Sequence, residues 1–236
     1  MLQRRGIRRS MASSTGDGSG SGFSGMDDYE SLISTTDAEL LKRAWRNEKA
    51  APEILRFEAS LVQRSREQIQ LMEETVEEYT KNGVDALSVS LYQMDLDRTL
   101  FLLRSYLRTR LQKIEKYAFH IQKTAELWNL LSKQEQTFAK RCTDDMEQLF
   151  EQSVLSKLPD RYKSHLKQSV ISEEDDMVPE AQLDSFVICR CKRFLGAFQL
   201  DETGVEKPVD LEADDLYALR YKSIKPLVES GQVDLV

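Results

Sequence analysis

The stretch from 86 to 122 constrains the fold more than any other part of the chain. Its apolar residues recur at helical spacing in two stripes, so we expect one long helix that is buried on more than one side. The longer stripe is Leu96, Leu100, Leu103, Leu107, Leu111, Ile114, Ala118 and Ile121, and the shorter one is Leu91, Met94, Phe101 and Leu102. A helix of this kind is the central helix of a bundle.

Further amphipathic helices are expected on both sides of this segment. Thr36 precedes Glu39 by three positions, and Ser132 precedes Glu135 by three, so each pair predicts a capping box at a helix start. Ser60 is expected to open another helix, which an Asn-Gly pair closes. The expected helices are 36–49, 60–82, 86–122 and 133–155.

The character of the chain changes after residue 165. The segment "ISEEDDMVPEAQ" is acidic and poor in apolar residues, which is typical of a linker. Next, "SFVICRCKRF" alternates with period two, with Val187, Cys189 and Cys191 on one face and Phe186 and Ile188 on the other. We expect "DETG" to be a turn, "KPVDLE" and "QVDLV" to be strands, and "KPLVESG" to be a short helix.

The predicted fold class is therefore α+β, with an N-terminal α-helical bundle domain, a linker and a small C-terminal β-rich domain. The expected divisions are a disordered tail at 1–33, the helical domain at 34–165, the acidic linker at 166–180 and the β-rich domain at 181–236. The Arg-rich opening "MLQRRGIRRSMASS" is also compatible with a mitochondrial presequence, although the Gly/Ser-rich run that follows favours a tail.

Composition narrows the function classes. The formal net charge is −7, so the chain as a whole does not attract DNA phosphates, and any DNA contact has to be local or indirect. Three cysteines favour a reducing compartment without structural disulfides. No apolar run approaches the roughly 20 residues that span a bilayer, so no membrane segment is expected.

Residues with catalytic or metal-binding chemistry are sparse. His120 and His165 have no neighbouring nucleophile–carboxylate pattern, and the C-x-C of Cys189 and Cys191 lacks a second ligand pair for zinc. We therefore predict no enzyme activity, no cofactor and no metal site. The acidic context of Ser172 resembles a kinase site.

The arginines of residues 98–113 carry the main functional signal. Arg98, Arg104, Arg108 and Arg110 lie among leucines and aromatic residues, a composition that is enriched in protein interfaces. Two alternatives remain open. One is pairing inside the chain with the acids of the second helix, and the other is nucleic-acid binding by a stand-alone adaptor that also uses Lys113. The second-helix acids are Glu73, Glu74, Glu77 and Glu78.

Three segments resemble one known family. "SYLRTRLQKIEKY" (105–117) resembles the hallmark segment of the Sld-five subunit of the eukaryotic GINS complex. "WRNEKAAPEIL" (45–55) and "LRYKSIKPLVESGQVDLV" (219–236) are similar to an early segment and to the C-terminal ending of that family. The resemblance covers about 30–236, in the order helical domain, linker, β module.

The resemblance implies a non-catalytic scaffold of the replicative DNA helicase in the nucleus. The implied partners are the Psf-one, Psf-two and Psf-three subunits in a heterotetramer, together with the MCM hexamer and Cdc-forty-five; replicative polymerases are further candidates. The residues expected at interfaces are Trp45, Arg98, Phe101, Arg104, Tyr106, Arg108, Arg110, Tyr221, Leu227, Val233 and Leu235.

Overall fold

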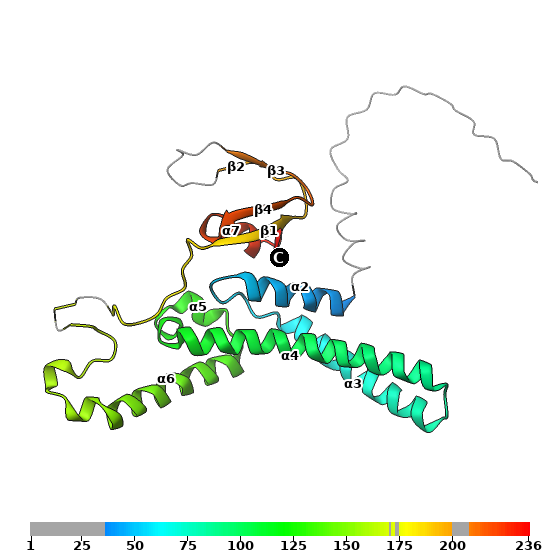
Figure 1. Cartoon of the computed structure of the whole chain (residues 1–236), viewed down its shortest axis with the longest axis horizontal. Helices are drawn as coiled ribbons and strands as arrows, with labels where there is room; N and C mark the ends of the chain where they lie inside the picture. The colour runs from blue at the N-terminus through cyan, green and yellow to red at the C-terminus, as the bar shows by residue number, and fades with distance from the viewer. Residues whose placement is uncertain (1–35, 170, 173–174, 200–207) are drawn as a thin grey trace, which may run out of the picture. The chain divides into compact units, whose positions relative to one another are not determined.

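A computed structural model describes residues 36–169, 171–172, 175–199 and 208–236 of the chain (Figure 1). The predictions for the N-terminal tail, whether disordered segment or presequence, and for the "DETG" turn lie outside these residues. The architecture is α+β, with helices first and a small sheet region at the C-terminal end. This is the predicted fold class.

The expected helices form close to their predicted positions. The helices are α2 (Asp37–Ala50), α3 (Ala59–Lys81), α4 (Ala86–Lys123), α5 (Ala125–Asn129) and α6 (Lys133–Ser153), with 3-10 turns at Leu155–Lys157 and Asp160–Tyr162. Ser132 and Glu135 make the predicted capping box in full. Thr36 caps α2 by accepting from the Glu39 N–H at 3.3 Å, but the Glu39 carboxylate contacts Lys42 and Arg98 instead of returning the bond. The short helix α5 was not predicted.

The start of α3 differs from the expectation. Glu58 occupies the N-cap position without a side-chain capping bond, and Ser60 lies inside the first turn. The prediction that Ser60 opens this helix is therefore wrong. Entry into α3 is instead held by the Glu58 N–H, which donates to the Tyr106 hydroxyl of α4 at 3.2 Å.

The long helix α4 is central within the helical region, since α2, α3 and α6 all pack against it (Figure 1). Most of its longer apolar stripe is buried or half-buried, as predicted, and Leu111 is the most exposed member at 37%. The shorter stripe behaves differently, because Leu91, Met94 and Phe101 are exposed and only Leu102 is buried. Among the residues that the structure describes, the shorter stripe is thus buried only at Leu102. Near its C-terminal end α4 kinks at Tyr117.

The C-terminal region contains two small antiparallel sheets. A three-stranded sheet has the order β4-β1-β5, and β2 pairs with β3. The elements are β1 (Phe186–Cys191), β2 (Gly196–Phe198), β3 (Val209–Leu211), β4 (Leu216–Arg220), α7 (Tyr221–Glu229) and β5 (Val233–Leu235). The predicted alternation in β1 is confirmed, with Val187, Cys189 and Cys191 buried. Helix α7 begins earlier than expected, which puts Pro226 inside it and not near its start.

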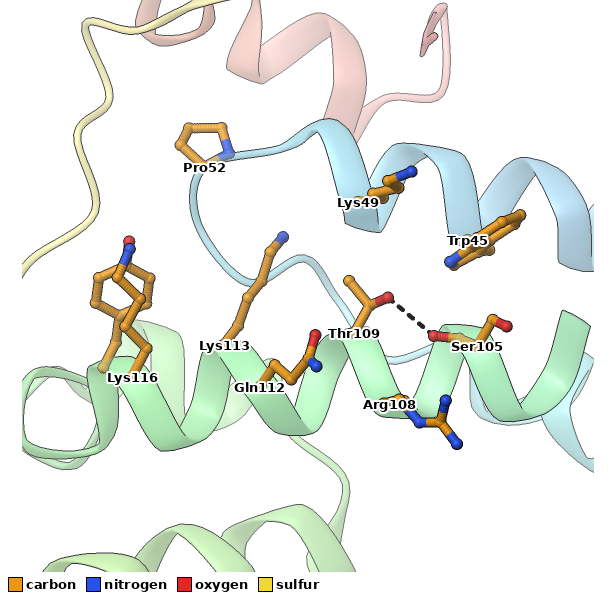
Figure 2. A pocket seen from close by; sticks show the side chains of 10 residues that line it. Trp45, Lys49, Pro52, Ser105, Arg108, Thr109, Gln112, Lys113 and Lys116 are labelled. Carbon is orange, nitrogen blue, oxygen red and sulfur yellow. Dashed lines mark hydrogen bonds between the residues drawn. The ribbon is translucent and has the colours of Figure 1, made fainter.

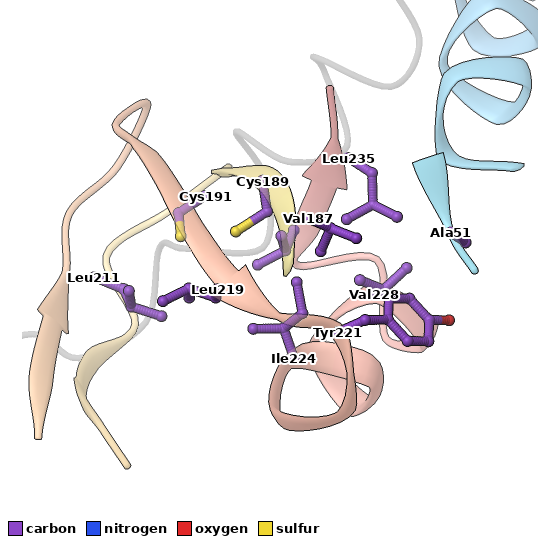
Figure 3. Packing of buried hydrophobic residues seen from close by; sticks show 11 residues of the cluster. Ala51, Val187, Cys189, Cys191, Leu211, Leu219, Tyr221, Ile224, Val228 and Leu235 are labelled. Carbon is purple, nitrogen blue, oxygen red and sulfur yellow. The ribbon is translucent and has the colours of Figure 1, made fainter. Parts of the chain in front are cut away.

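The end of α2 packs against the β region. Ala51 belongs to the same buried cluster as Cys189 and Leu235 (Figure 3). The Asn47 side chain accepts from the Leu235 N–H at 2.7 Å, and Lys225 of α7 contacts Glu53 at 2.8 Å. The described residues from 36 onward therefore form one compact unit. The division into a helical and a β-rich domain stays a prediction.

Candidate interaction surfaces and the network beneath them

Arg110 lies at the centre of a buried ion-pair network. Its side chain is 0% exposed, and its guanidinium donates to Glu135 at 2.7 Å, to Glu48 at 2.9 Å and to the Leu55 carbonyl at 2.7 Å. Three elements converge here, because Glu48 comes from α2, Arg110 from α4 and Glu135 from α6. The prediction that Arg110 lies at a subunit interface is wrong, since every side of its guanidinium is occupied inside its own chain.

Lys113, one turn further along α4, belongs to the same network. Its ammonium donates to the Glu48 carboxylate at 3.0 Å and to the backbone carbonyls of Glu48 and Glu53. The two cations Arg110 and Lys113 thus face the two carboxylates Glu48 and Glu135, so the network is balanced in charge. Charges buried this deeply are tolerated only when they are paired in this way.

The pKa directions reflect the same balance. Burial alone would lower the pKa of Arg110, but the Glu135 hydrogen bond and the Glu48 charge outweigh it, and the pKa is raised. For Lys113 burial prevails over the attraction of Glu48, and the pKa is lowered. At neutral pH the arginine stays charged and holds the two carboxylates together.

Tyr106 is also an interior residue. It is 1% exposed, stacks on Phe57 with ring centroids 6.4 Å apart, and lies beside Arg110. Burial raises the pKa of its hydroxyl to about 12, with the Arg110 charge acting in the opposite direction. The interface prediction for Tyr106 is therefore corrected to a core position.

Three predicted interface residues of the β region are interior as well. Tyr221 is 0% exposed, Val233 1% and Leu235 2%, and all three belong to one buried cluster (Figure 3). Their spacing marked a packed core and not a contact surface, because they pack with Cys189, Ile224 and the other buried residues of this cluster. Leu227 is half-buried at the edge of the same cluster.

The remaining interface candidates stand at the surface or half-buried. Trp45 is half-buried and contacts Phe101 edge to face at 6.0 Å, and Phe101 itself is 60% exposed. Arg104 and Arg108 are exposed and have no anionic partner among the described residues, whereas Arg98 reaches Glu39 at 4.0 Å. For these residues the interface assignment stays a prediction.

Internal pairing of the arginines does occur, but with other acids than expected. The partners are Glu39, Glu48 and Glu135, and not the four glutamates of α3. Sequence reasoning missed Glu48 because it looked polar and solvated within a charged helix. The available signal was that Arg110 and Lys113 share the buried side of α4 with the apolar stripe, where each requires an anion.

An exposed apolar row runs along the N-terminal half of α4. Leu87, Leu91, Met94 and Phe101 recur at helical spacing and are between 56% and 68% exposed. Leu71 of α3 adds another exposed apolar side chain at 63%. We call the four α4 residues the apolar row. The exposed Arg98 lies on the same helix face between Met94 and Phe101. Large apolar side chains that recur exposed along one helix face are typical of interaction surfaces.

A basic pocket lies further along α4, where α2 ends (Figure 2). Its volume is about 530 Å³, and its lining combines four cationic side chains with no carboxylate. The lining residues are Trp45, Lys49, Pro52, Ser105, Arg108, Thr109, Gln112, Lys113, Lys116 and Tyr117. We call this feature the basic pocket.

The histidines and cysteines occupy packed positions. His165 stacks on Phe150, and His120 contacts Glu180 of the linker at 3.3 Å. Cys189 is fully buried, and this burial raises the pKa of its thiol to about 11, which keeps it protonated and unreactive at neutral pH. Among the described residues no group of three or more His, Cys, Asp or Glu side chains is placed to hold a metal ion. The same part of the chain contains no helix both long and apolar enough to cross a membrane.

Comparison with known proteins gives two matching families. Residues 61–154 match "GINS complex protein helical bundle domain", and residues 182–236 match "DNA replication complex GINS protein SLD5 C-terminus". Together the two matches cover more than half of the chain. The first match lies within the helical region and the second covers the β region, and the whole acidic linker at 166–180 falls between them.

Individual relatives agree with these matches. A DNA replication complex GINS protein SLD5 from Arabidopsis thaliana is 58% identical over 212 residues, covering 90% of this chain and 96% of that protein. The corresponding proteins of Rattus norvegicus and Mus musculus are each 35% identical, covering 89% and 85% of this chain and 95% and 91% of those proteins.

Fold and surfaces together define a class of protein: a helical bundle with a small β region attached, stabilised by internal ion pairs and offering exposed faces for contact. Within this class, the matched domains and relatives identify the family. The chain belongs to the SLD5 family of GINS complex subunits.

Proposed function

We propose that the chain is a non-catalytic scaffold subunit of a nuclear GINS heterotetramer, built with the Psf-one, Psf-two and Psf-three subunits. In this proposal the tetramer joins the MCM hexamer and Cdc-forty-five in the replicative DNA helicase. Support comes from the relatives, which are named as GINS proteins of the DNA replication complex. The physical support is the exposed apolar row on α4.

The apolar row is the observation that carries the proposal. Met94 is 64% exposed and Leu91 56% exposed, although both lie on the helix that organises the whole bundle. Each apolar Å² removed from water contributes about 25 cal/mol, so helices of another subunit packed along this row would gain several kcal/mol. This is how obligate assemblies differ from isolated domains, because their interfaces resemble a core divided between two chains.

The polar groups of the interior support a structural role. Arg110, Lys113, Glu48 and Glu135 satisfy one another and the neighbouring backbone, so each is used to join α2, α4 and α6. A catalytic group needs an accessible position and a pKa suited to proton transfer or attack. In the network, burial and complete pairing serve rigidity instead.

The stand-alone adaptor is less well supported than the scaffold. Its proposed DNA-binding track combined four arginines with Lys113 on one surface. Arg110 is interior, Lys113 is paired with Glu48 and is only 12% exposed, and Arg98 contacts Glu39. Two exposed arginines separated by one helical turn remain, Arg104 and Arg108. Phosphate tracks of nucleic-acid-binding proteins require more cations than this.

Co-expression tests the proposal. The full chain is produced with tagged Psf-one, Psf-two and Psf-three subunits, and the purified particle is sized and its subunit ratio measured. We expect an equimolar four-subunit particle. The chain produced alone should self-associate, because the apolar row is then exposed to water. A monodisperse monomer that never enters the particle would contradict the scaffold assignment.

A further inference from the structure

The basic pocket lies on a chain whose net charge has the opposite sign. The chain carries a formal net charge of −7, yet the ten residues that line this pocket include two types of cation and no acid. Lys49 comes from α2, whereas Arg108, Lys113 and Lys116 come from α4, where they are spread over more than two helical turns (Figure 2). Such a local reversal of sign creates a positive potential in a concave site, where the field is focused.

The charges beneath the pocket do not cancel this potential. Lys113 is the deepest of the four cations, with 12% of its side chain exposed, and it is bound to Glu48 and to backbone carbonyls. Arg110 and Lys113 together balance Glu48 and Glu135, so the buried network contributes no net charge. The positive charge available to a ligand is therefore that of the three exposed residues.

These three exposed cations are available for an anion. Lys49, Arg108 and Lys116 are exposed, and none of them has a carboxylate partner among residues 36–169 and the other described segments. Polar groups lie between them: Gln112 offers an amide, and Ser105 offers a hydroxyl beside the bond that Thr109 donates to the Ser105 carbonyl at 2.9 Å (Figure 2). An amide, a hydroxyl and three cations together are donors suited to carboxylates.

The aromatic rings of the pocket argue against single-stranded nucleic acid. Bases stack on open aromatic faces, and such stacking accounts for much of the affinity in single-strand binding proteins. Here the Lys49 ammonium lies over the Trp45 ring at 5.7 Å, and the Lys116 ammonium lies over the Tyr117 ring at 4.9 Å. The two rings thus hold the lysines in place, and the pocket presents charge more than stacking surface.

We propose that the basic pocket between α2 and α4 binds an acidic segment of a partner polypeptide through its aspartate or glutamate side chains. The carboxylates contact Lys116 and Lys49 across the opening, and Arg108 binds a further carboxylate at the edge. Charge complementarity selects this occupant, since three unpaired cations match a short acidic segment better than a long phosphate backbone. The inference goes beyond the scaffold proposal, because it concerns the cations of the pocket, whereas the apolar row carries the scaffold proposal; the two features adjoin where Trp45 of the pocket contacts Phe101 of the row.

A labelled peptide of eight glutamates serves as the probe, with octaglutamine and an oligothymidylate of equal charge as comparisons. Binding to the full chain is followed by fluorescence anisotropy at low and at moderate salt. We expect the glutamate peptide to bind in a salt-dependent manner and more tightly than either comparison. Lys116→Glu and, separately, Arg108→Glu should weaken it about tenfold or more, whereas Arg108→Lys keeps the charge and should weaken it less.

The matched control is Arg66→Glu, which makes the same charge change at an exposed position of α3 outside the pocket. An equal loss in Arg66→Glu would show that binding follows net charge alone and would overturn the proposal. Tighter binding of the oligothymidylate, or no binding of the glutamate peptide, would overturn it as well. Assembly yield is measured for Lys116→Glu and Arg66→Glu, and it is expected to stay normal for both, so failure of the scaffold proposal remains distinguishable from failure of this one.

Discussion

The carboxylate of Glu135 accepts from the Arg110 guanidinium at 2.7 Å and, through its other oxygen, from the Ser132 N–H at 2.8 Å. One side chain therefore both caps α6 and closes the buried ion-pair network. The first turn of α6 is thereby joined to α4, because the same carboxylate makes both contacts. Glu135 thus takes part both in a local helix cap and in a tertiary contact between α6 and α4.

Replacing Arg110 should be among the most destabilising changes in the chain. Arg110→Met leaves Glu48 and Glu135 buried without their cation, and breaking a buried pair in this way typically costs about 3–5 kcal/mol. Arg110→Lys should recover part of the loss, since an ammonium cannot contact both carboxylates with the same fork. Urea denaturation of the full chain, followed by circular dichroism, measures the free energy of unfolding.

Arg104→Met is the control for this comparison, because Arg104 is exposed on the same helix. We expect it to change the free energy of unfolding by no more than about 0.5 kcal/mol. Equal stability of the Arg104 and Arg110 variants would show that the buried network contributes nothing beyond ordinary packing.

Tyr106 should make the chain sensitive to alkali. Its folded-state pKa is raised from about 10 to about 12 by burial, so the folded state holds the proton more tightly than the unfolded state. The stabilisation is fully present below pH 10 and is lost as the pH rises from about 10 to about 12, amounting to about 2–3 kcal/mol. Lys113, whose pKa is lowered, acts in the opposite direction as the pH approaches 10.5.

Tyr106→Phe isolates this contribution from that of Lys113. The variant loses the acceptor for the Glu58 N–H, a cost of about 1 kcal/mol near neutral pH. Its stability should then fall less steeply than that of the wild type above pH 10, because it has no hydroxyl at this position to ionise. Parallel stability curves for the two proteins in this range would disprove the assignment.

Sequence patterns predicted the helices well and the interior polar contacts poorly. The long stripe of α4 and the Ser132–Glu135 cap depend on spacing along one segment, and spacing is visible in the sequence. The partner of Arg110 depends on which residues of α2 and α6 lie opposite it, and this is decided by packing. Arg110, an arginine beside an apolar stripe, was therefore predicted to be an interface residue, although it forms ion pairs with Glu48 and Glu135 of its own chain.

The same limit explains the errors in the β region. Tyr221, Val233 and Leu235 carry the spacing of buried residues, but spacing does not tell whether the cover comes from this chain or from a partner. The structure assigns the cover to α7, the neighbouring strands and Ala51. The apolar row shows the opposite outcome. Its residues have the same helical spacing as buried residues, but among the described residues they remain exposed.

Asn47 should couple the helical and β regions. Its side chain accepts from the Leu235 N–H at 2.7 Å, so Asn47→Ala removes an acceptor for a backbone donor of β5. We expect a loss of about 1–2 kcal/mol and faster hydrogen exchange at the Leu235 amide. Arg46→Ala, at the exposed neighbouring position, should leave this amide unchanged. An unaltered exchange rate in Asn47→Ala would mean that the β region is stable without α2.

A cut near Met177 examines the same junction from the other side. The helical fragment should keep its α-helical circular dichroism, because the network of Arg110 and the cores around α4 lie entirely before the cut. It should nevertheless melt at a lower temperature than the full chain, since Ala51 and Asn47 lose their packing against β5. Complete loss of helical signal would contradict the proposed domain division.

The apolar row should decide whether the subunit assembles. Met94→Glu and Leu91→Glu each place a charge on an exposed apolar face, so the fold of the lone chain is preserved while packing against a second helix is penalised by several kcal/mol. In co-expression with the three partner subunits, we expect a strong loss of tetramer yield together with better solubility of the chain alone. Gln122→Glu adds the same charge at an exposed position near the other end of α4 and should assemble normally. Normal yields for both Met94→Glu and Leu91→Glu would remove the apolar row from the assembly interface.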